Sequence, residues 1–111
     1  MQVWKLANSV ITPTSISPLD FGLPLNPLAS VRGGQPAENA AMLTSLLAGE
    51  LPTSHPVENF VVLNSAALLL VAGKVSTAVE GVALARKSIA TGQAKAALDA
   101  FRTVSQAFSP L

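Results

Sequence analysis

The longest apolar stretch, FVVLNSAALLLVA at residues 60–72, constrains the fold of this chain more than any other feature. A helix that crosses a bilayer needs about 20 apolar residues, whereas this stretch is shorter and contains Asn64 and Ser65. It instead predicts a buried helix, over about residues 57–72, that is apolar almost all round. Such a helix must be covered by other parts of a protein on every side.

Composition indicates that part of this cover lies outside the chain. Of the 111 residues, 50% are hydrophobic and 12% are charged, whereas about a quarter of the residues in an average soluble domain are charged. A chain of this length is at most one domain and leaves much of its surface exposed. We therefore expect a partner, or further polypeptide, to cover some of its apolar surface.

Charge and cysteine content exclude several classes of function. Seven basic and six acidic side chains give a net charge of +1, which offers no electrostatic footprint for nucleic acid. We interpret five basic residues near the carboxy terminus as a solvated face: Lys74, Arg86, Lys87, Lys95 and Arg102. Without cysteine and with one histidine, the chain alone can form neither a disulfide nor a zinc site. The start, MQVWKLANSVI, lacks a secretory signal, so we expect a cytoplasmic protein with no membrane anchor.

The amino-terminal part predicts two short strands within about residues 2–17. Val3-Trp4-Lys5-Leu6 forms the first, Ala7-Asn8-Ser9 the turn, and residues 10–17 the second. Pro13 lies inside the second strand, which therefore is either at a sheet edge or broken there. A connector rich in proline then leads to residue 34.

Four helices are predicted over about residues 36–108. Their expected ranges are 36–47, 57–72, a segment that begins after Ser76 and ends at Thr91-Gly92, and 94–107. A proline in the first turn and a glycine after the last turn bound the first two helices. Ser76 is the expected N-cap of the third helix. The fourth has an apolar stripe at Ala97, Leu98, Phe101, Val104 and Phe108.

These elements predict an α/β fragment, a short amino-terminal strand pair followed by about four helices. Two strands form at most a hairpin, which is marginally stable alone. Neither the hairpin nor three short helices can cover an all-round apolar helix and also close a sheet. The chain is therefore expected to be a piece of a larger α/β domain whose other strands lie elsewhere.

The glycine pair in GGQPAENAAML, residues 33–43, raises the question of a phosphate site. A phosphate loop of the Walker type needs Gly-Lys-Ser/Thr after its first glycine, and here Gln35 and Pro36 follow. The glycine spacing of a dinucleotide fingerprint is absent too. Glu38 in the first helical turn complements the helix N-terminus and would repel a phosphate. The pair is interpreted as a structural helix start, with an anion site as the alternative.

The remaining polar residues nominate no reactive group. His55 beside Ser54 has no orienting carboxylate and is interpreted as a surface loop residue. Asp20 in Asp-Phe-Gly is interpreted as a turn residue, because the other kinase motifs are absent. Asn39 and Asn64 lie in apolar helix segments and are predicted to tie helices to neighbouring loops, with a ligand contact as the alternative. No two carboxylates stand together; they are Asp20, Glu38, Glu50, Glu58, Glu80 and Asp99.

Five motifs in order carry a resemblance to a known family. They are PLDFGL (18–23), GGQPAENA (33–40), LLAGE (46–50), VVLNSAALLLVAGK (61–74) and EGVALARKSIATGQA (80–94). In this order they resemble the carboxy-terminal region of the anthranilate phosphoribosyltransferase family, and VWKL before them is similar to that family's strand pair. The resemblance covers the chain to about Phe101.

The resemblance implies a fold and an activity for the intact protein. The family transfers phosphoribosyl from phosphoribosyl pyrophosphate to anthranilate in tryptophan biosynthesis, uses magnesium and usually forms a homodimer. Its fold, of the nucleoside phosphorylase/phosphoribosyltransferase type, joins a small helical domain to an α/β domain. Residues 1–111 would then be the carboxy-terminal part of this glycosyltransferase-family α/β domain.

The resemblance also implies that this chain has no catalytic, cofactor-binding or metal-binding residue. The family's glycine-rich phosphate loop, basic loop and acidic magnesium-binding pair all precede the matched region, and its dimer surface belongs mainly to the helical domain. The chain alone is thus expected to be structural and inactive, with the rest of the enzyme as its partner. The alternatives are a free-standing helical interaction module and a subunit that complements a separately encoded amino-terminal piece.

Overall fold

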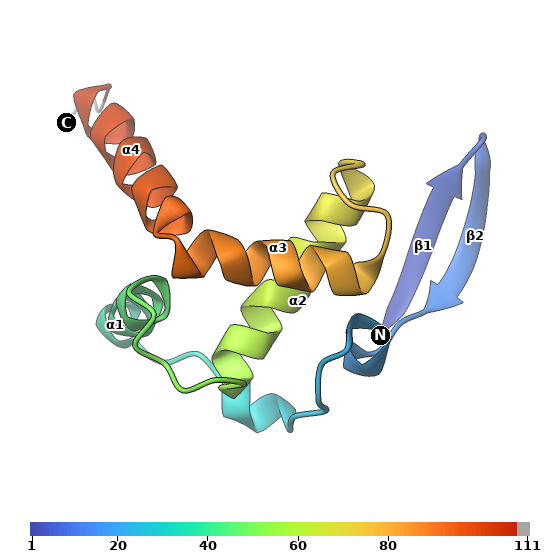
Figure 1. Ribbon diagram of the computed structural model, residues 1–111, viewed down its shortest axis with the longest axis horizontal. Helices are drawn as coiled ribbons and strands as arrows, with labels where there is room; N and C mark the ends of the chain where they lie inside the picture. Colours follow the sequence, from blue (N-terminus) through green and yellow to red (C-terminus); the bar gives the residue numbers. More distant parts are fainter. Residues whose placement is uncertain (109–111) are drawn as a thin grey trace.

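The computed structural model describes residues 1–108 and contains a strand pair followed by four α-helices (Figure 1). The strands β1 (Gln2–Ala7) and β2 (Val10–Ser15) pair antiparallel. Two 3-10 turns follow, η1 (Pro18–Phe21) and η2 (Leu28–Val31), and then α1 (Pro36–Leu47), α2 (Pro56–Val71), α3 (Ala78–Ala90) and α4 (Gln93–Ala107). The predicted fold class, a strand pair followed by helices, is confirmed.

Local capping explains where the helices begin and end. His55 caps α2, since its Nδ1 accepts the N–H of Val57 at 3.2 Å, and Gly73 follows α2 with φ of 69°. The prediction that Ser76 caps α3 is wrong, because the hydroxyl of Thr77 accepts the N–H of Glu80. The carboxylate of Glu80 in turn accepts the N–H of Ser76 at 3.0 Å, which fixes the chain just before the helix.

The two strands differ in length from the prediction, and a two-residue turn joins them. β1 covers residues 2–7 and is thus longer than the predicted residues 3–6. β2 ends at Ser15 rather than at residue 17, and Pro13 lies within it without breaking it, which agrees with an edge strand. Asn8 and Ser9 form the turn with φ of 51° and 62°. Positive φ at both central positions is the geometry that joins twisted antiparallel strands most tightly.

The core lies where α2 crosses α3. Val62 and Ala66 of α2 are 0% exposed, and they pack in one cluster with Val82 and Ala85 of α3. The η1 turn adds Phe21 to this cluster, and Leu23 follows it. The chain after the hairpin thus folds onto the crossing of the two helices.

Gly81 allows the two helices to approach closely. A Cβ placed on Gly81 would lie 2.8 Å from the Cβ of Ala66 and 2.9 Å from its Cα. Distances this short to a backbone atom cannot be relieved by turning a side chain. The crossing of α2 and α3 therefore requires a residue without a side chain at position 81.

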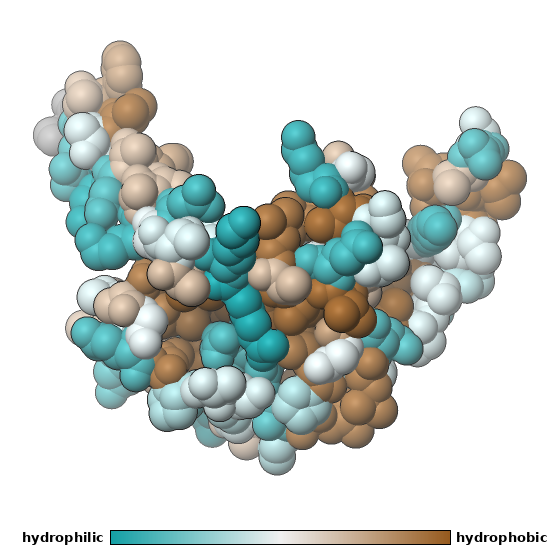
Figure 2. Space-filling view, viewed as in Figure 1, coloured by the Kyte–Doolittle hydropathy of each residue, from teal (hydrophilic) through white to brown (hydrophobic). Residues whose placement is uncertain are grey.

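Much apolar surface is left uncovered by the described residues. Leu68 and Val71 of α2 are 72% and 89% exposed, although the sequence predicts a helix that needs cover on every side. The apolar stripe of α4 is exposed too, with Phe101 at 71%, and α4 projects away from the other helices (Figure 1). Apolar side chains also gather over the middle of the molecule in Figure 2. Within residues 1–108, no helix is both long enough and apolar enough to cross a bilayer.

Gly81→Ala should lower the free energy of unfolding by about 1–3 kcal/mol, because the added methyl group overpacks the helix crossing. Helix propensity alone predicts the opposite sign, a gain of about 1 kcal/mol. Urea unfolding followed by circular dichroism measures the change.

Ala83→Leu is the matched control, because it adds bulk at an exposed position of the same helix and should change stability by less than about 0.5 kcal/mol. Ala66→Gly added to Gly81→Ala should recover part of the loss by restoring space. A stabilising Gly81→Ala would contradict the close approach.

Candidate functional site

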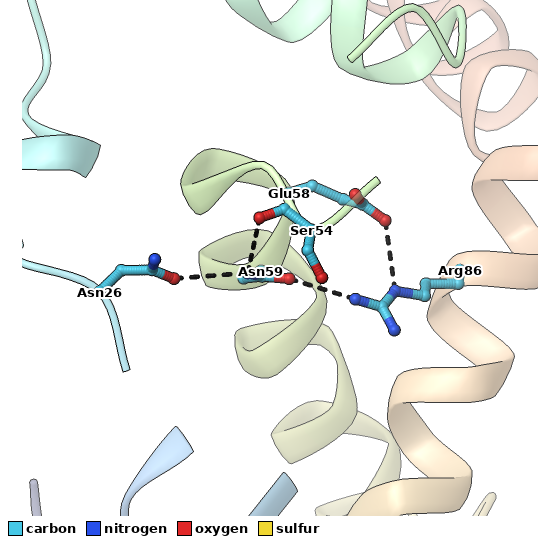
Figure 3. A network of polar contacts seen from close by, with 5 residues as sticks. All are labelled: Asn26, Ser54, Glu58, Asn59 and Arg86. Atoms are coloured by element: carbon cyan, nitrogen blue, oxygen red, sulfur yellow. Dashed lines mark hydrogen bonds and ion pairs between the residues drawn. The ribbon is translucent and has the colours of Figure 1, made fainter. Parts of the chain in front are cut away.

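A buried amide in the first turns of α2 is the centre of a polar network (Figure 3). Asn59 is 4% exposed and is the one buried polar side chain among residues 1–108. Its Nδ2 donates to the carbonyl of Ser54 at 3.1 Å and to Oδ1 of Asn26 at 3.3 Å. One side chain thereby joins the start of α2 to the loop before it and to the proline-rich connector.

Arg86 of α3 completes the network from the other side. Its Nη2 donates to Oδ1 of Asn59 at 3.1 Å, and its Nε donates to Oε1 of Glu58 at 3.2 Å. The guanidinium presents several donors in one plane, so it can serve two neighbouring acceptors at once. The side chain of Glu58 is 17% exposed and that of Arg86 is 37% exposed, so the ion pair lies at the rim of the buried region.

The network is satisfied and contains no free reactive group. No buried side-chain nitrogen or oxygen lacks a partner in the part of the chain that the structure describes. Glu58 and Arg86 border a hollow of about 550 Å³, together with residues of the α1–α2 loop and the end of α3. A paired carboxylate, a paired guanidinium and an amide can position chain segments, but they supply no nucleophile.

The structure corrects the sequence interpretation of the polar residues of α2. Asn64 does not tie its helix to a loop, because it is exposed and its Nδ2 donates to the carbonyl of Phe60 in the same helix at 2.8 Å. Asn59 was missed. The signal for it was spacing, since residues 59, 62 and 66 follow each other at three and four positions and so share one helix face with Val62 and Ala66. His55 is half-buried as the cap of α2, rather than a surface loop residue.

The glycine pair leads into a self-contained helix start. The N–H of Gly34 donates to Oδ1 of Asn39 at 2.8 Å, and the N–H of Gln35 donates to Oε2 of Glu38 at 2.7 Å. Nδ2 of Asn39 returns a bond to the carbonyl of Gly34 at 3.1 Å, so Asn39 ties α1 to this loop as predicted. An anion at this N-terminus would have to displace the carboxylate of Glu38 from the N–H of Gln35 and the amide of Asn39 from that of Gly34. The arrangement supports the interpretation of a structural turn.

The carboxylates present do not fit a magnesium site. No group of three or more metal-ligating side chains occurs among residues 1–108. Five of the six carboxylates bind other partners: Asp20 accepts the N–H of Ser17, Glu38 that of Gln35 and Glu80 that of Ser76, while Glu58 pairs with Arg86 and Asp99 with Lys95. Asp20 is a local capping residue, as its interpretation as a turn residue implied.

Comparison of the sequence with known proteins identifies a family. Residues 1–95 match the family model described as "Glycosyl transferase family, a/b domain". The chain is 41% identical over 103 residues to the anthranilate phosphoribosyltransferase of Schizosaccharomyces pombe, covering 93% of this chain and 29% of that protein.

Two bacterial relatives of the same name give similar values. Identity to the protein of Caulobacter vibrioides is 48% over 97 residues, which is 87% of this chain and 28% of the relative. Identity to the protein of Rhodopseudomonas palustris is 43% over 105 residues, which is 95% of this chain and 30% of that relative. The chain therefore spans less than a third of the length of these relatives.

Asn59→Ala should lower the free energy of unfolding by about 1–3 kcal/mol, because it leaves the Ser54 carbonyl and an Arg86 donor without their buried partner. Asn64→Ala is the matched control on the same helix and should change stability by less than about 0.5 kcal/mol. Urea unfolding measures both. Equal effects of the two substitutions would contradict a special role for the Asn59 network.

Proposed function

The chain belongs to the glycosyl transferase family through its a/b domain, and on this basis we propose that it is the carboxy-terminal segment of an anthranilate phosphoribosyltransferase. The observation that carries the proposal is the extent of the match: 41% identity over 93% of this chain corresponds to 29% of the relative. The intact enzyme would transfer phosphoribosyl from phosphoribosyl pyrophosphate to anthranilate in tryptophan biosynthesis. The domain extent proposed for this segment is residues 1–111.

The role that we propose for this segment is scaffolding. The Asn59–Arg86 network and the close crossing at Gly81 hold α2, α3 and the connector as one unit. The exposed apolar residues of α2 and α4 are the kind that pack against a sheet and against other helices in an α/β domain. The unit would cover part of the sheet whose loops hold the substrates.

Under this proposal, the catalytic groups lie in the remainder of the enzyme. Transfer of phosphoribosyl requires charge neutralisation of the leaving pyrophosphate, by cationic donors or by a metal such as magnesium. Among residues 1–108, five of the six carboxylates are engaged with backbone N–H groups, lysine or arginine. We therefore propose that magnesium and both substrates bind to the other part, and that the homodimer contact of the family is made largely there too.

The alternative is a subunit that complements a separately encoded amino-terminal part, or an interaction module without catalysis. The exposed stripe of α4 favours a partner over a free-standing monomer, because a contiguous apolar stripe is rarely left open to water. Both alternatives share the property that the chain alone is inactive.

The isolated chain should consume no anthranilate in the presence of phosphoribosyl pyrophosphate and magnesium ions. A chimera in which it replaces the matched segment of the Schizosaccharomyces pombe relative should be active, because the missing catalytic groups are then restored. Loss of anthranilate fluorescence measures the reaction, with the unaltered relative as the positive control. Activity of the isolated chain, or a folded but inactive chimera, would contradict the proposal.

The isolated chain should also bind a hydrophobic fluorescent dye strongly, whereas the folded chimera should not. The reason is that the residues exposed on α2 and α4 become buried against the rest of the domain. Dye fluorescence at equal molar concentration compares the two. A chain that stays monomeric, melts sharply and binds no dye would favour the free-standing module.

A further inference from the structure

The hydrogen-bond register of the hairpin determines which backbone groups point out of it. Met1 and Ile16 exchange both of their bonds, N–H of Met1 to the carbonyl of Ile16 and N–H of Ile16 to the carbonyl of Met1, each at 2.8 Å. In an antiparallel pair, such bonded pairs alternate with non-bonded pairs. With the observed register, the non-bonded pairs are Gln2–Ser15, Trp4–Pro13 and Leu6–Ile11. The backbone groups of these residues point away from the partner strand.

The two outer edges of the hairpin are consequently different. On β2 the middle outward position is Pro13, which has no N–H, so this edge cannot form a continuous ladder with another strand. On β1 the outward positions are Gln2, Trp4 and Leu6, which all carry an N–H. The register leaves the N–H groups of these three residues without a partner in β2, and they donate to no other segment within residues 1–108. β1 is thus the edge that can accept a further strand.

The side chains distinguish the faces of the hairpin in the same way. Trp4 and Leu6 of β1 and Ile11 of β2 belong to the non-bonded pairs. Because side chains alternate between the two faces along a strand, these three side chains lie on the same face of the hairpin. They are 66%, 70% and 64% exposed. Lys5 lies on the opposite face. An edge with unpaired N–H groups and an apolar face beside it are both features of a sheet that continues.

We propose that the free edge of β1 pairs with an extended strand from the part of the α/β domain that lies outside the matched segment. This inference rests on the proposed function. The match indicates which strand would pair here. The family domain is α/β, residues 1–108 supply two strands, and the Schizosaccharomyces pombe relative contains more than twice as much further polypeptide. In Figure 1, β1 is the strand nearer to the helices, so a sheet extended from β1 grows toward α3 rather than away from it.

The test uses amide hydrogen exchange of the chimera and of the isolated chain. Pairing at β1 should slow exchange at Trp4 and Leu6 by at least about tenfold in the chimera relative to the isolated chain. The outward N–H groups of Ile11 and Ser15 on β2 should exchange equally fast in both. Fast exchange at Trp4 and Leu6 in an active chimera would overturn the pairing and leave the proposed function intact.

Two matched substitutions test the same edge independently. Leu6 and Ile11 lie opposite each other in one non-bonded pair. Leu6→Pro and Ile11→Pro therefore each remove an N–H that points away from the partner strand, and neither removes a hydrogen bond between β1 and β2. Leu6→Pro should lower the melting temperature of the chimera, whereas Ile11→Pro should leave it unchanged. The proposed pairing would be overturned if Ile11→Pro lowered the melting temperature as much as Leu6→Pro or more. A chimera that folds and is inactive overturns the proposed function, and the inference with it.

Discussion

The contact between Gly81 and Ala66 is the constraint on which the rest of this structure depends. Because residue 81 has no side chain, α2 and α3 cross with their backbones close together. That crossing brings Val62 against Val82 and Ala85, and it sets Arg86 opposite the amide of Asn59 one turn beyond. A wider separation of the helices would break both the apolar packing and the two hydrogen bonds of the guanidinium, since neither can stretch with the gap. Steric fit and polar recognition are therefore coupled at one place.

Local sequence signals predict most of the helix boundaries, because proline and glycine act on the backbone only near their own positions. Proline in the first turn and glycine after the last turn mark α1 and α2 almost to the residue, because both effects act within a few positions. The features that were missed depend on partners far away in the sequence. Asn59 is bound by Asn26 and Arg86, and Gly81 looks like an ordinary helical glycine until Ala66 is placed beside it. The N-cap of α3 is Thr77 rather than the predicted Ser76, because both residue types cap helices and only Thr77 lies three positions before Glu80.

The polar site joins three segments of the chain, and its hydrogen bonds explain how. The amide of Asn59 is bound on both sides, through Nδ2 by Ser54 and Asn26 and through Oδ1 by Arg86, so the junction gains rigidity. The match covers less than a third of the relatives' length, so under the proposed function this junction would lie in one supporting segment of a longer protein. A supporting role of this kind would also account for a composition with so few charged residues.

The adjacency of α2 and α3 in the sequence has a kinetic consequence. Only the short link from Ala72 to Thr77 separates the two helices, so closing their contact costs little chain entropy. Contacts between neighbouring helices form faster than pairing between distant strands. The helical pair is therefore expected to assemble early, as a nucleus that is complete before any strand from a distant part of the polypeptide arrives. In that order of events, and with the pairing proposed for β1, the hairpin would be the last element of this segment to find its final environment.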